Sequence, residues 1–318
     1  MRILPKIALG TWSWGTGAVG GDAVFGNHLT EDQMTDLFAA GMKAGLYLWD
    51  TAPVYGMGSS EAALGKAMRR FPREDILVST KFTPQIANEG TEHPVENMIK
   101  GSLARLSVNS IDIYWIHNPH DVEKWTQGLI PLLQDGRVKR VGVSNHNLAQ
   151  IRRADEILGQ AGFGVSAVQN HYSLLYRSSE YAGILDYCDE KAITFFSYMV
   201  LEQGALSGRY DVSHPMPAGS SRAETYNKSL AQLEKLTLAM SSIAARRAAS
   251  VAQIAIAWAI SKGTVPIIGA TRVKHISEAV GSLNITLSTD EIATLERLAA
   301  ETGVDTRGAW EERMDTTA

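Results

Sequence analysis

Hydrophobic positions along this chain alternate between two spacings. Short runs rich in β-branched and aromatic residues occur at residues 7–12, 46–50, 76–82, 111–117, 139–144, 165–170, 193–198 and 265–268. The segments between these runs carry apolar residues at helical spacing, as in MTDLFAAGMKAG, VENMIKGSLARL and VAQIAIAWAISK. A strand followed by a helix, repeated along the chain, predicts a parallel sheet.

Eight such repeats, with no GxGxxG motif near the start, favour a closed (β/α)8 TIM barrel over an open doubly wound sheet. Three predicted helices begin with a capping pattern, at Thr30 to Gln33, Ser250 to Gln253 and Ser288 to Glu291. No Pro/Gly-rich linker divides the chain, so residues 1–318 are predicted to form one barrel domain.

Two stretches interrupt this alternation of strands and helices. GTGAVGGDAVFGNH follows the first predicted strand, and residues 199–226 follow the seventh; both are expected to be loops over a site on the carboxyl-terminal face of the barrel. The last segment, GVDTRGAWEERMDTTA, is polar and is expected to be a tail that packs on or near the barrel rim.

Composition narrows the function classes. The 318 residues are 45% hydrophobic and 20% charged, without an apolar run of membrane-spanning length or the pattern of a secretory signal, which predicts a soluble, cytoplasmic enzyme. The formal charge of −4 and the absence of a Lys/Arg cluster argue against nucleic acid as a partner. The single cysteine, Cys188, is expected to be a small buried apolar residue.

Four polar residues stand where predicted strands end. Asp50, Lys81 and His117 close LYLWD, ILVSTK and IDIYWIH, and Tyr55 follows in DTAPVY. Strand ends of a parallel barrel open onto one face, so these side chains are expected to converge. A cation lowers the high pKa of a phenol by stabilising the phenolate, so Lys81, held by Asp50, is expected to activate Tyr55 as a proton donor. His117 is suited to bind the substrate oxygen or to pass a proton.

Each of these residues is also compatible with a purely structural role. Taken singly, an Asp–Lys pair is more often structural, and a lone histidine is more often a satisfied polar group. His117 and His120 have no further ligand to complete a zinc site, so no metal is expected. GVSNH lacks the G-x-S-x-G elbow, which disfavours hydrolase chemistry at Ser144.

At this point the chain resembles the aldo-keto reductase superfamily over nearly its whole length. The motifs that carry the resemblance are GTW at 10–12, DTAPVYG, STKF, DIYWIHNP, VGVSNH and VQNHYSLLYR. The resemblance implies an (α/β)8 barrel that uses a nicotinamide cofactor without a Rossmann fold. Tyr55 would be the general acid, supported by Asp50, Lys81 and His117.

The resemblance also implies the cofactor contacts. Ser144, Asn145 and Gln169 would bind the nicotinamide carboxamide, and Tyr198 would stack on its ring, unless it is plain barrel core. Further contacts are implied at Gly10, Thr11, Trp12, Asp50, Met199, Leu201, Gln203, Gly204, Leu206, Gly269, Ala270, Thr271, Arg272, His275 and Glu278. Arg272 would favour NADP by pairing with a 2'-phosphate, its alternative being a solvated charge at a helix start.

Three departures from the family pattern concern the cofactor. Met199-Val200 stands where many relatives have Ser-Pro, Ala279 where many have Asn, and His275 where many have Arg or Gln. The adenosine end is therefore less well defined than the nicotinamide end. NADP(H) is the preferred cofactor, and NAD(H) remains open.

The resulting hypothesis is an NAD(P)H-dependent reductase of an aldehyde or ketone, with Trp12, Trp14, Tyr55 and His117 around the substrate and Val24 and Phe25 in the loop nearby. One rival is a cofactor-binding regulatory subunit like the potassium-channel β-subunits, disfavoured because the chain begins at its first strand. A second is Schiff-base chemistry at Lys81. The sequence does not define the physiological substrate, the reaction direction or the oligomeric state.

Overall fold

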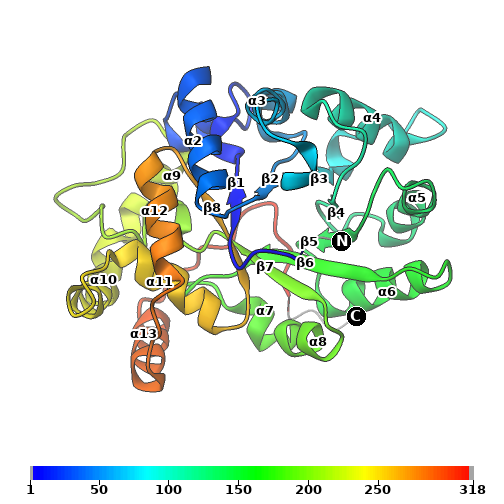
Figure 1. Ribbon diagram of the computed structural model, residues 1–318. Coiled ribbons are helices and arrows are strands. Elements are labelled where there is room, and N and C mark those ends of the chain that lie inside the picture. The colour runs from blue at the N-terminus through cyan, green and yellow to red at the C-terminus, as the bar shows by residue number, and fades with distance from the viewer. Residues whose placement is uncertain (1–2, 315–318) are drawn as a thin grey trace.

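Eight parallel strands close into a barrel in the computed structural model, which describes residues 3–314. Each strand pairs with the next in the sequence, and the last pairs with the first through Leu9 and Ile268. The strands are β1 (Ala8–Gly10), β2 (Leu48–Asp50), β3 (Leu77–Phe82), β4 (Ile113–Ile116), β5 (Val141–Ser144), β6 (Val165–His171), β7 (Thr194–Tyr198) and β8 (Val265–Gly269). The predicted (β/α)8 fold is confirmed (Figure 1).

Helices surround the barrel on its outer side (Figure 1). They are α1 (Gly21–Phe25), α2 (Glu31–Lys43), α3 (Ser59–Met68), α4 (Pro94–Leu106), α5 (Val122–Gln134), α6 (Leu148–Gly159), α7 (Ser178–Tyr181), α8 (Ile184–Glu190), α9 (Ser221–Tyr226), α10 (Leu230–Ala245), α11 (Val251–Ser261), α12 (Val273–Ser282) and α13 (Thr289–Glu301). Within residues 3–314, none of them combines the length and the apolar character that crossing a membrane requires.

The predicted helix starts are confirmed in atomic detail. Thr30, Ser250 and Ser288 each accept the backbone N–H three residues on, and the side chain at that position bonds back to the N-cap backbone. Asn147 makes the same reciprocal bond with Gln150 at the start of α6, where the sequence analysis named no cap. Each of these caps satisfies backbone donors that a helix leaves unpaired.

Six of the strands are shorter than the apolar runs predicted, and β6 and β8 each extend one residue further. The run at 7–12 becomes β1 at Ala8–Gly10, and Trp12 begins the 3-10 helix η1 (Trp12–Trp14). The run at 111–117 becomes β4 at Ile113–Ile116, with Ile111 forming an isolated bridge to Val138 and His117 lying just beyond the strand. These apolar runs therefore continue beyond the residues that form backbone hydrogen bonds between strands.

Two apolar layers fill the fold. Alternate strand residues point into the barrel, where Leu48, Leu77, Trp115 and Phe196 belong to one buried cluster. The residues between them point outward and pack against the helices in a much larger core. Gly142 leaves room for the ring of Trp115, because a Cβ at position 142 would overlap that ring.

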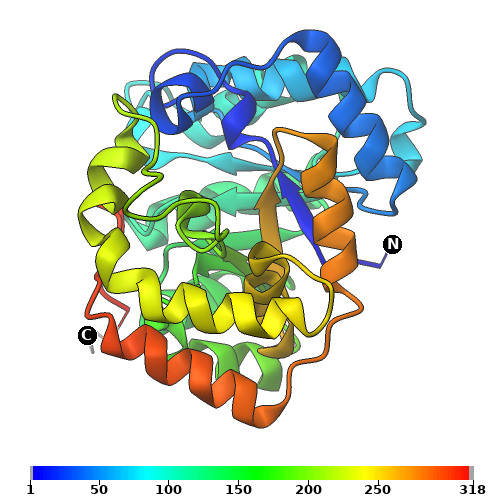
Figure 2. The ribbon, with the colours of Figure 1, turned by 90° about the vertical axis from the view of Figure 1, so that its left-hand side faces the viewer.

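The long loops after β1 and β7 meet at the carboxyl ends of the strands. The first contains α1, the second contains α9, and these two helices contact each other. In Figure 2 the strands run toward the left, which is the side where α9 and the red C-terminal segment lie. In Figure 1 that segment is seen behind the strands, across the barrel.

Candidate active site

The candidate site is the polar continuation of the barrel interior. Side chains alternate along a strand, so Asp50 shares the inward face with Leu48 and Lys81 shares it with Leu77. His117 follows Trp115 in the same way, one residue past β4. The inward positions thus change from apolar to polar at the carboxyl ends, and the predicted convergence of Asp50, Lys81 and His117 has this structural basis.

Lys81 is completely buried and paired. Its Nζ lies 2.6 Å from Oδ2 of Asp50 and donates to the carbonyl of Thr51 at 2.8 Å. The other carboxylate oxygen of Asp50 accepts from the hydroxyl of Ser79 at 2.6 Å and from the amide of Gln169 at 3.2 Å. Ser79 and Gln169 therefore fix the carboxylate of Asp50 while its other oxygen pairs with the ammonium.

Ionic pairing decides the protonation state of Lys81. Burial by itself lowers the pKa of the ammonium, but the charges of Asp50 and Tyr55 and their hydrogen bonds raise it, and the net direction is upward. Lys81 is thus a cation at neutral pH. A protonated amine is not a nucleophile, so the Schiff-base alternative is disfavoured.

A tight turn brings Tyr55 to this pair. Tyr55 begins the 3-10 helix η2 (Tyr55–Gly58), in which Gly56, Met57 and Gly58 all have positive φ, of 58°, 49° and 95°. A Cβ on Gly56 would collide with the hydroxyl of Ser59 and the backbone of the β1 loop, so the turn requires glycine there. The turn reverses the chain immediately after the strand and leaves Tyr55 over the barrel mouth.

Lys81 lowers the pKa of Tyr55 as expected, but burial of the phenol has a larger effect on that pKa. Nζ of Lys81 lies 4.9 Å from the centre of the Tyr55 ring. Burial raises the pKa of the phenol more than the charge of Lys81 lowers it, and Asp50 raises it further. The expectation of a lowered pKa is therefore wrong for the net direction, because the desolvation of the phenolate outweighs one shielded cation.

His117 lies edge-on to Tyr55, with ring centres 5.9 Å apart and an interplanar angle of 83°. Its Nδ1 is 2.8 Å from the hydroxyl of Thr83. Burial and the nearby charge of Lys81 hold the pKa of His117 well below its usual value, so the imidazole is neutral. When Thr83 donates to Nδ1, the ring proton resides on Nε2.

The residues expected to bind the carboxamide lie beside His117. Asn145 has a φ of 63°, and its Nδ2 donates to the carbonyl of His117 at 2.8 Å and to the hydroxyl of Ser144 at 3.3 Å. Its Oδ1 lies 2.6 Å from the hydroxyl of Tyr198. The backbone N–H of Asn145 donates to the carbonyl of Gln169 at 3.2 Å, and Gln169 bonds to Asp50, so all four residues expected at the nicotinamide belong to one connected group next to Lys81.

Aromatic rings cover Tyr55. Trp12 stacks on it with ring centres 5.4 Å apart, and Phe25 and Trp310 each contact Trp12 edge-on. Trp14 lies elsewhere, so its place in the expected aromatic wall is not supported. Trp14 is buried, packs against Trp49 and donates its indole N–H to the carbonyl of Ala270.

The loops after β7 and β8 contain the positions expected at the cofactor phosphates. In the first loop, Met199 and Gln203 have positive φ, of 61° and 51°, and the buried Oε1 of Gln203 has no hydrogen-bond partner among the described residues. Leu206 is completely buried and packs within the main hydrophobic core. In the second loop, Arg272 is the N-cap of α12, and its side chain makes no capping hydrogen bond to the first backbone N–H groups of the helix.

Several positively charged side chains lie near His275, at the start of α12. Burial is the main cause of the lowered pKa of His275, and the charges of Arg272, Arg209 and Lys274 lower it further, against the carboxylate of Glu278. Arg209 comes from the β7 loop and was not among the predicted site residues. Its only signal was its position six residues after Gln203, within the loop already expected to cover the site.

Comparison with known proteins identifies the family. The model of the aldo/keto reductase family matches residues 6–300. The chain belongs to this family. It is 33% identical to the chloroplastic pyridoxal reductase of Arabidopsis thaliana over 313 residues, which covers 93% of this chain and 83% of that protein. An uncharacterized oxidoreductase of Mycobacterium tuberculosis is 31% identical over 289 residues, 89% of this chain and 85% of its own length.

Solved aldo-keto reductases have the same fold. One from Klebsiella pneumoniae, in complex with NADPH, is 25% identical with a TM-score of 0.73, covering 99% of this chain and 95% of that chain. The thermostable aldo-keto reductase Tm1743, in complex with the inhibitor epalrestat, is 26% identical with a TM-score of 0.74, covering 92% and 95%. The barrel of this aldo-keto reductase family member thus matches experimentally determined relatives along nearly its whole length.

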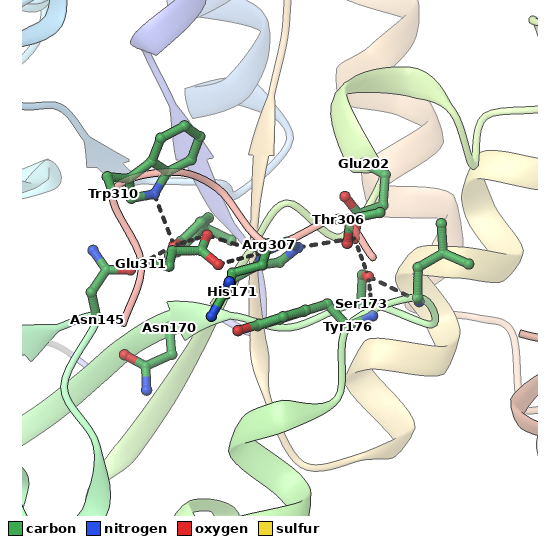
Figure 3. Close-up of polar contacts among 12 residues, drawn as sticks. Asn145, Asn170, His171, Ser173, Tyr176, Glu202, Thr306, Arg307, Trp310 and Glu311 are labelled. Carbon is green, nitrogen blue, oxygen red and sulfur yellow. Dashed lines mark hydrogen bonds and ion pairs between the residues drawn. The ribbon is translucent and has the colours of Figure 1, made fainter. Parts of the chain in front are cut away.

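The C-terminal segment, predicted to be a polar tail, contributes buried groups next to the site. Glu311 is buried between Tyr198 and His171, and Trp310 lies beside it with its indole N–H 3.4 Å from the hydroxyl of Tyr198 (Figure 3). Thr306 donates to Glu202 from the same segment. No spacing rule marks these residues, because their partners lie more than a hundred positions away.

Cys188 is buried in α8, and burial raises the pKa of its thiol to about 12. A thiol with so high a pKa is not ionised at neutral pH and is a poor nucleophile. The packing role predicted for this residue agrees with its burial.

Proposed function

We propose that this protein reduces an aldehyde or ketone to an alcohol with hydride from NADPH and a proton from Tyr55. The observation that carries the proposal is the buried Asp50–Lys81 ion pair beside Tyr55 and His117. This arrangement keeps a phenol protonated next to a fixed cation. Such a phenol can donate its proton to a carbonyl oxygen as negative charge develops there.

Lys81 and Asp50 have separate roles in this proposal. The ammonium of Lys81 stabilises the phenolate that remains after Tyr55 has given up its proton. Asp50 keeps the ammonium charged and, with Ser79 and Thr51, fixes its position. The high pKa of Tyr55 in this structure means that the acid form is fully present at neutral pH.

His117 is proposed to orient the substrate. With Thr83 donating to Nδ1, Nε2 carries the proton and can hydrogen-bond a carbonyl oxygen beside Tyr55. The depressed pKa of His117 keeps the ring neutral, so it acts as a hydrogen-bond donor and does not compete with Tyr55 as an acid. Two donors directed at one oxygen favour a single orientation of the carbonyl.

The residues present fit a nicotinamide cofactor, which supplies hydride when bound. Asn145 and Gln169 offer amide groups, Ser144 a hydroxyl, and Tyr198 a ring face, all within one connected group beside Lys81. At the other end, the N-terminus of α12 offers backbone N–H donors to the phosphates, and the unpaired oxygen of Gln203 can accept from a sugar hydroxyl. The solved relative from Klebsiella pneumoniae, with NADPH bound, supports this assignment.

Charge at the phosphate end favours NADPH over NADH. Arg209, Arg272 and Lys274 all lie near enough to His275 to lower its pKa. A cluster of cations stabilises the two charges that a 2'-phosphate adds, whereas a ribose hydroxyl gains little from it. We therefore propose NADP(H) as the preferred cofactor, with NAD(H) as the weaker alternative.

The substrate is proposed to be an aldehyde or ketone with a flat or apolar body. Trp12, Phe25 and Trp310 bound the space next to Tyr55 with aromatic rings. Rings of this kind pack well against an aromatic substrate. The name of the pyridoxal reductase relative makes pyridoxal, an aromatic aldehyde, a substrate to test first.

The proposal is tested with a panel of aldehydes and ketones, pyridoxal included, assayed with NADPH and with NADH by loss of reduced-nicotinamide absorbance. Tyr55→Phe should lower turnover by about 10² to 10⁴, the usual value of a well-placed acid, while NADPH still binds. Near-normal turnover in Tyr55→Phe, or no turnover with any carbonyl in the wild-type protein, would contradict it.

A further inference from the structure

Glu311 places a buried carboxylate at the edge of the group expected to hold the nicotinamide. Only 7% of its surface is exposed. Its Oε1 lies 2.7 Å from the hydroxyl of Tyr198 and 3.0 Å from Nδ1 of His171. A carboxylate buried this deeply needs hydrogen-bond partners, and both of its partners come from the barrel strands.

His171 holds Glu311 in place from the other side. Nε2 of His171 lies 2.9 Å from Glu202, which also accepts from the hydroxyls of Ser173 and Tyr226. Burial by itself lowers the pKa of His171, but Glu202 and Glu311 raise it to about 10. The ring is therefore an imidazolium at neutral pH, and each of its N–H groups donates to one carboxylate (Figure 3).

Stacking makes this arrangement rigid. The rings of Tyr176 and His171 are stacked with centres 4.3 Å apart, and His171 stacks in turn on Tyr198 with centres 5.5 Å apart. The imidazolium between two phenol rings gains from their π electrons as well as from the two carboxylates. The position of the Tyr198 hydroxyl relative to Glu311 is fixed as a result.

One proton then has two acceptors. The hydroxyl of Tyr198 lies 2.6 Å from Oδ1 of Asn145 and 2.7 Å from Oε1 of Glu311, yet a phenol carries a single O–H. The orientation of the Asn145 amide is set independently, because its Nδ2 donates to the carbonyl of His117. Both competitors for the proton are therefore oxygens, one neutral and one charged.

The charged oxygen is the stronger acceptor. Hydrogen bonds to an ionised carboxylate are roughly twice as strong as those between neutral groups. Tyr198 thus donates to Glu311, and both lone pairs of Oδ1 of Asn145 are left for other donors. A primary carboxamide N–H is such a donor.

We propose that Glu311 is a positioning residue for the cofactor site: by accepting the proton of Tyr198, it leaves Oδ1 of Asn145 free to accept an N–H from a primary carboxamide. The proposal rests on the proposed function, since it assigns that carboxamide to the nicotinamide. It makes the C-terminal segment part of the recognition of the cofactor, although Glu311 acts through Tyr198 and Asn145.

The proposal predicts selectivity between two cofactors that differ in one group. The reduced 3-acetylpyridine analogue of NADP keeps the carbonyl of the carboxamide but has a methyl group in place of its NH₂. It cannot donate to Asn145. The wild-type protein should bind NADPH about tenfold more tightly than this analogue, as expected for one well-formed hydrogen bond.

The experiment measures the dissociation constants of both compounds with the full chain, by isothermal titration calorimetry. In Glu311→Gln the acceptor is a neutral amide oxygen no stronger than that of Asn145, so the proton is shared and the tenfold ratio should fall several-fold. Glu311→Leu removes the acceptor, so that Tyr198 donates to Oδ1 of Asn145 and competes with the carboxamide, and the ratio should fall further than in Glu311→Gln. The control Glu312→Gln makes the same charge change on an exposed neighbour and should keep the wild-type ratio.

The outcomes separate this proposal from the proposed function. If both affinities weaken equally in Glu311→Gln, or neither changes, then Glu311 only anchors the segment and the proposal is overturned, while NADPH binding and turnover in the wild-type protein still support the reductase. If the wild-type protein binds neither compound, both proposals fail together. Should Glu311→Leu not fold, the ratio in Glu311→Gln decides the question.

Discussion

Nδ1 of His171 lies 3.0 Å from the carboxylate of Glu311, although 140 positions separate the two residues in the sequence. His171 ends β6, and Glu311 follows the last helix. Their contact, together with the bond from His171 to Glu202, ties the C-terminal segment to the barrel mouth. The charge on His171 is therefore linked to the stability of the folded chain.

This link predicts a pH dependence. The pKa of His171 is about 10 in the folded protein and about 6.5 in an unfolded chain, so the folded state retains a proton that the unfolded state releases between these values. The stabilisation is complete below about pH 6.5 and is lost as the pH rises through about 10. Urea unfolding between pH 6 and 10 should show this decline, and NMR should show both ring nitrogens of His171 protonated at pH 8. A ring that titrates near pH 6.5 would contradict the prediction.

Breaking the buried ion pair should destabilise the barrel. Lys81→Met leaves the carboxylate of Asp50 buried without its cation, which typically costs about 3–5 kcal/mol in the free energy of unfolding. The double variant Asp50→Asn, Lys81→Met removes both charges and should regain much of that stability without regaining turnover. Chemical denaturation and the carbonyl assay measure the two effects separately.

A surface pair provides the control for Lys81. Lys66→Met breaks an exposed pair with Glu31 and should change both stability and turnover very little, because solvent screens that pair. If Lys81→Met were no more destabilising than Lys66→Met, the buried pair would not have the role assigned to it here.

Arg209 should affect cofactor choice. Arg209→Gln removes a cation whose charge reaches His275, so the dissociation constant for NADPH should rise about tenfold, the value of one charged hydrogen bond, while that for NADH changes much less. The control Arg297→Gln removes an exposed arginine from α13, where it pairs with Glu301. Equal effects of the two substitutions on NADPH binding would argue against a phosphate contact at Arg209.

The barrel interior should not tolerate a side chain at position 142. A Cβ on Gly142 would overlap the ring of Trp115, which is completely buried, so Gly142→Ala should destabilise the fold by about 1–3 kcal/mol. Gly159→Ala is the matched control, because a Cβ there meets nothing within 4 Å and its φ is not positive. Thermal and denaturant unfolding of both variants compare the two positions, and similar stabilities would contradict the close contact with Trp115.

Much of the candidate site could be read from local sequence. Asp50, Lys81 and His117 were found because they end apolar runs, and the barrel places the ends of parallel strands on one face. Ser144, Asn145, Gln169 and Tyr198 came from motif resemblance, and the structure brings them together. Trp14 was misplaced, because an aromatic residue near a strand end is equally suited to the core, where it packs on Trp49.

The sequence by itself determined the alternation of strands and helices, the capped helix starts and the positions of the catalytic candidates, because these depend on residues within a few positions of each other. The tertiary structure decided the raised pKa of Tyr55, the approach of Arg209 to His275 and the burial of Glu311 against His171. Desolvation and charge depend on which distant segments surround a group. No local sequence pattern in the C-terminal segment indicates that the partners of Glu311 lie on β6 and β7.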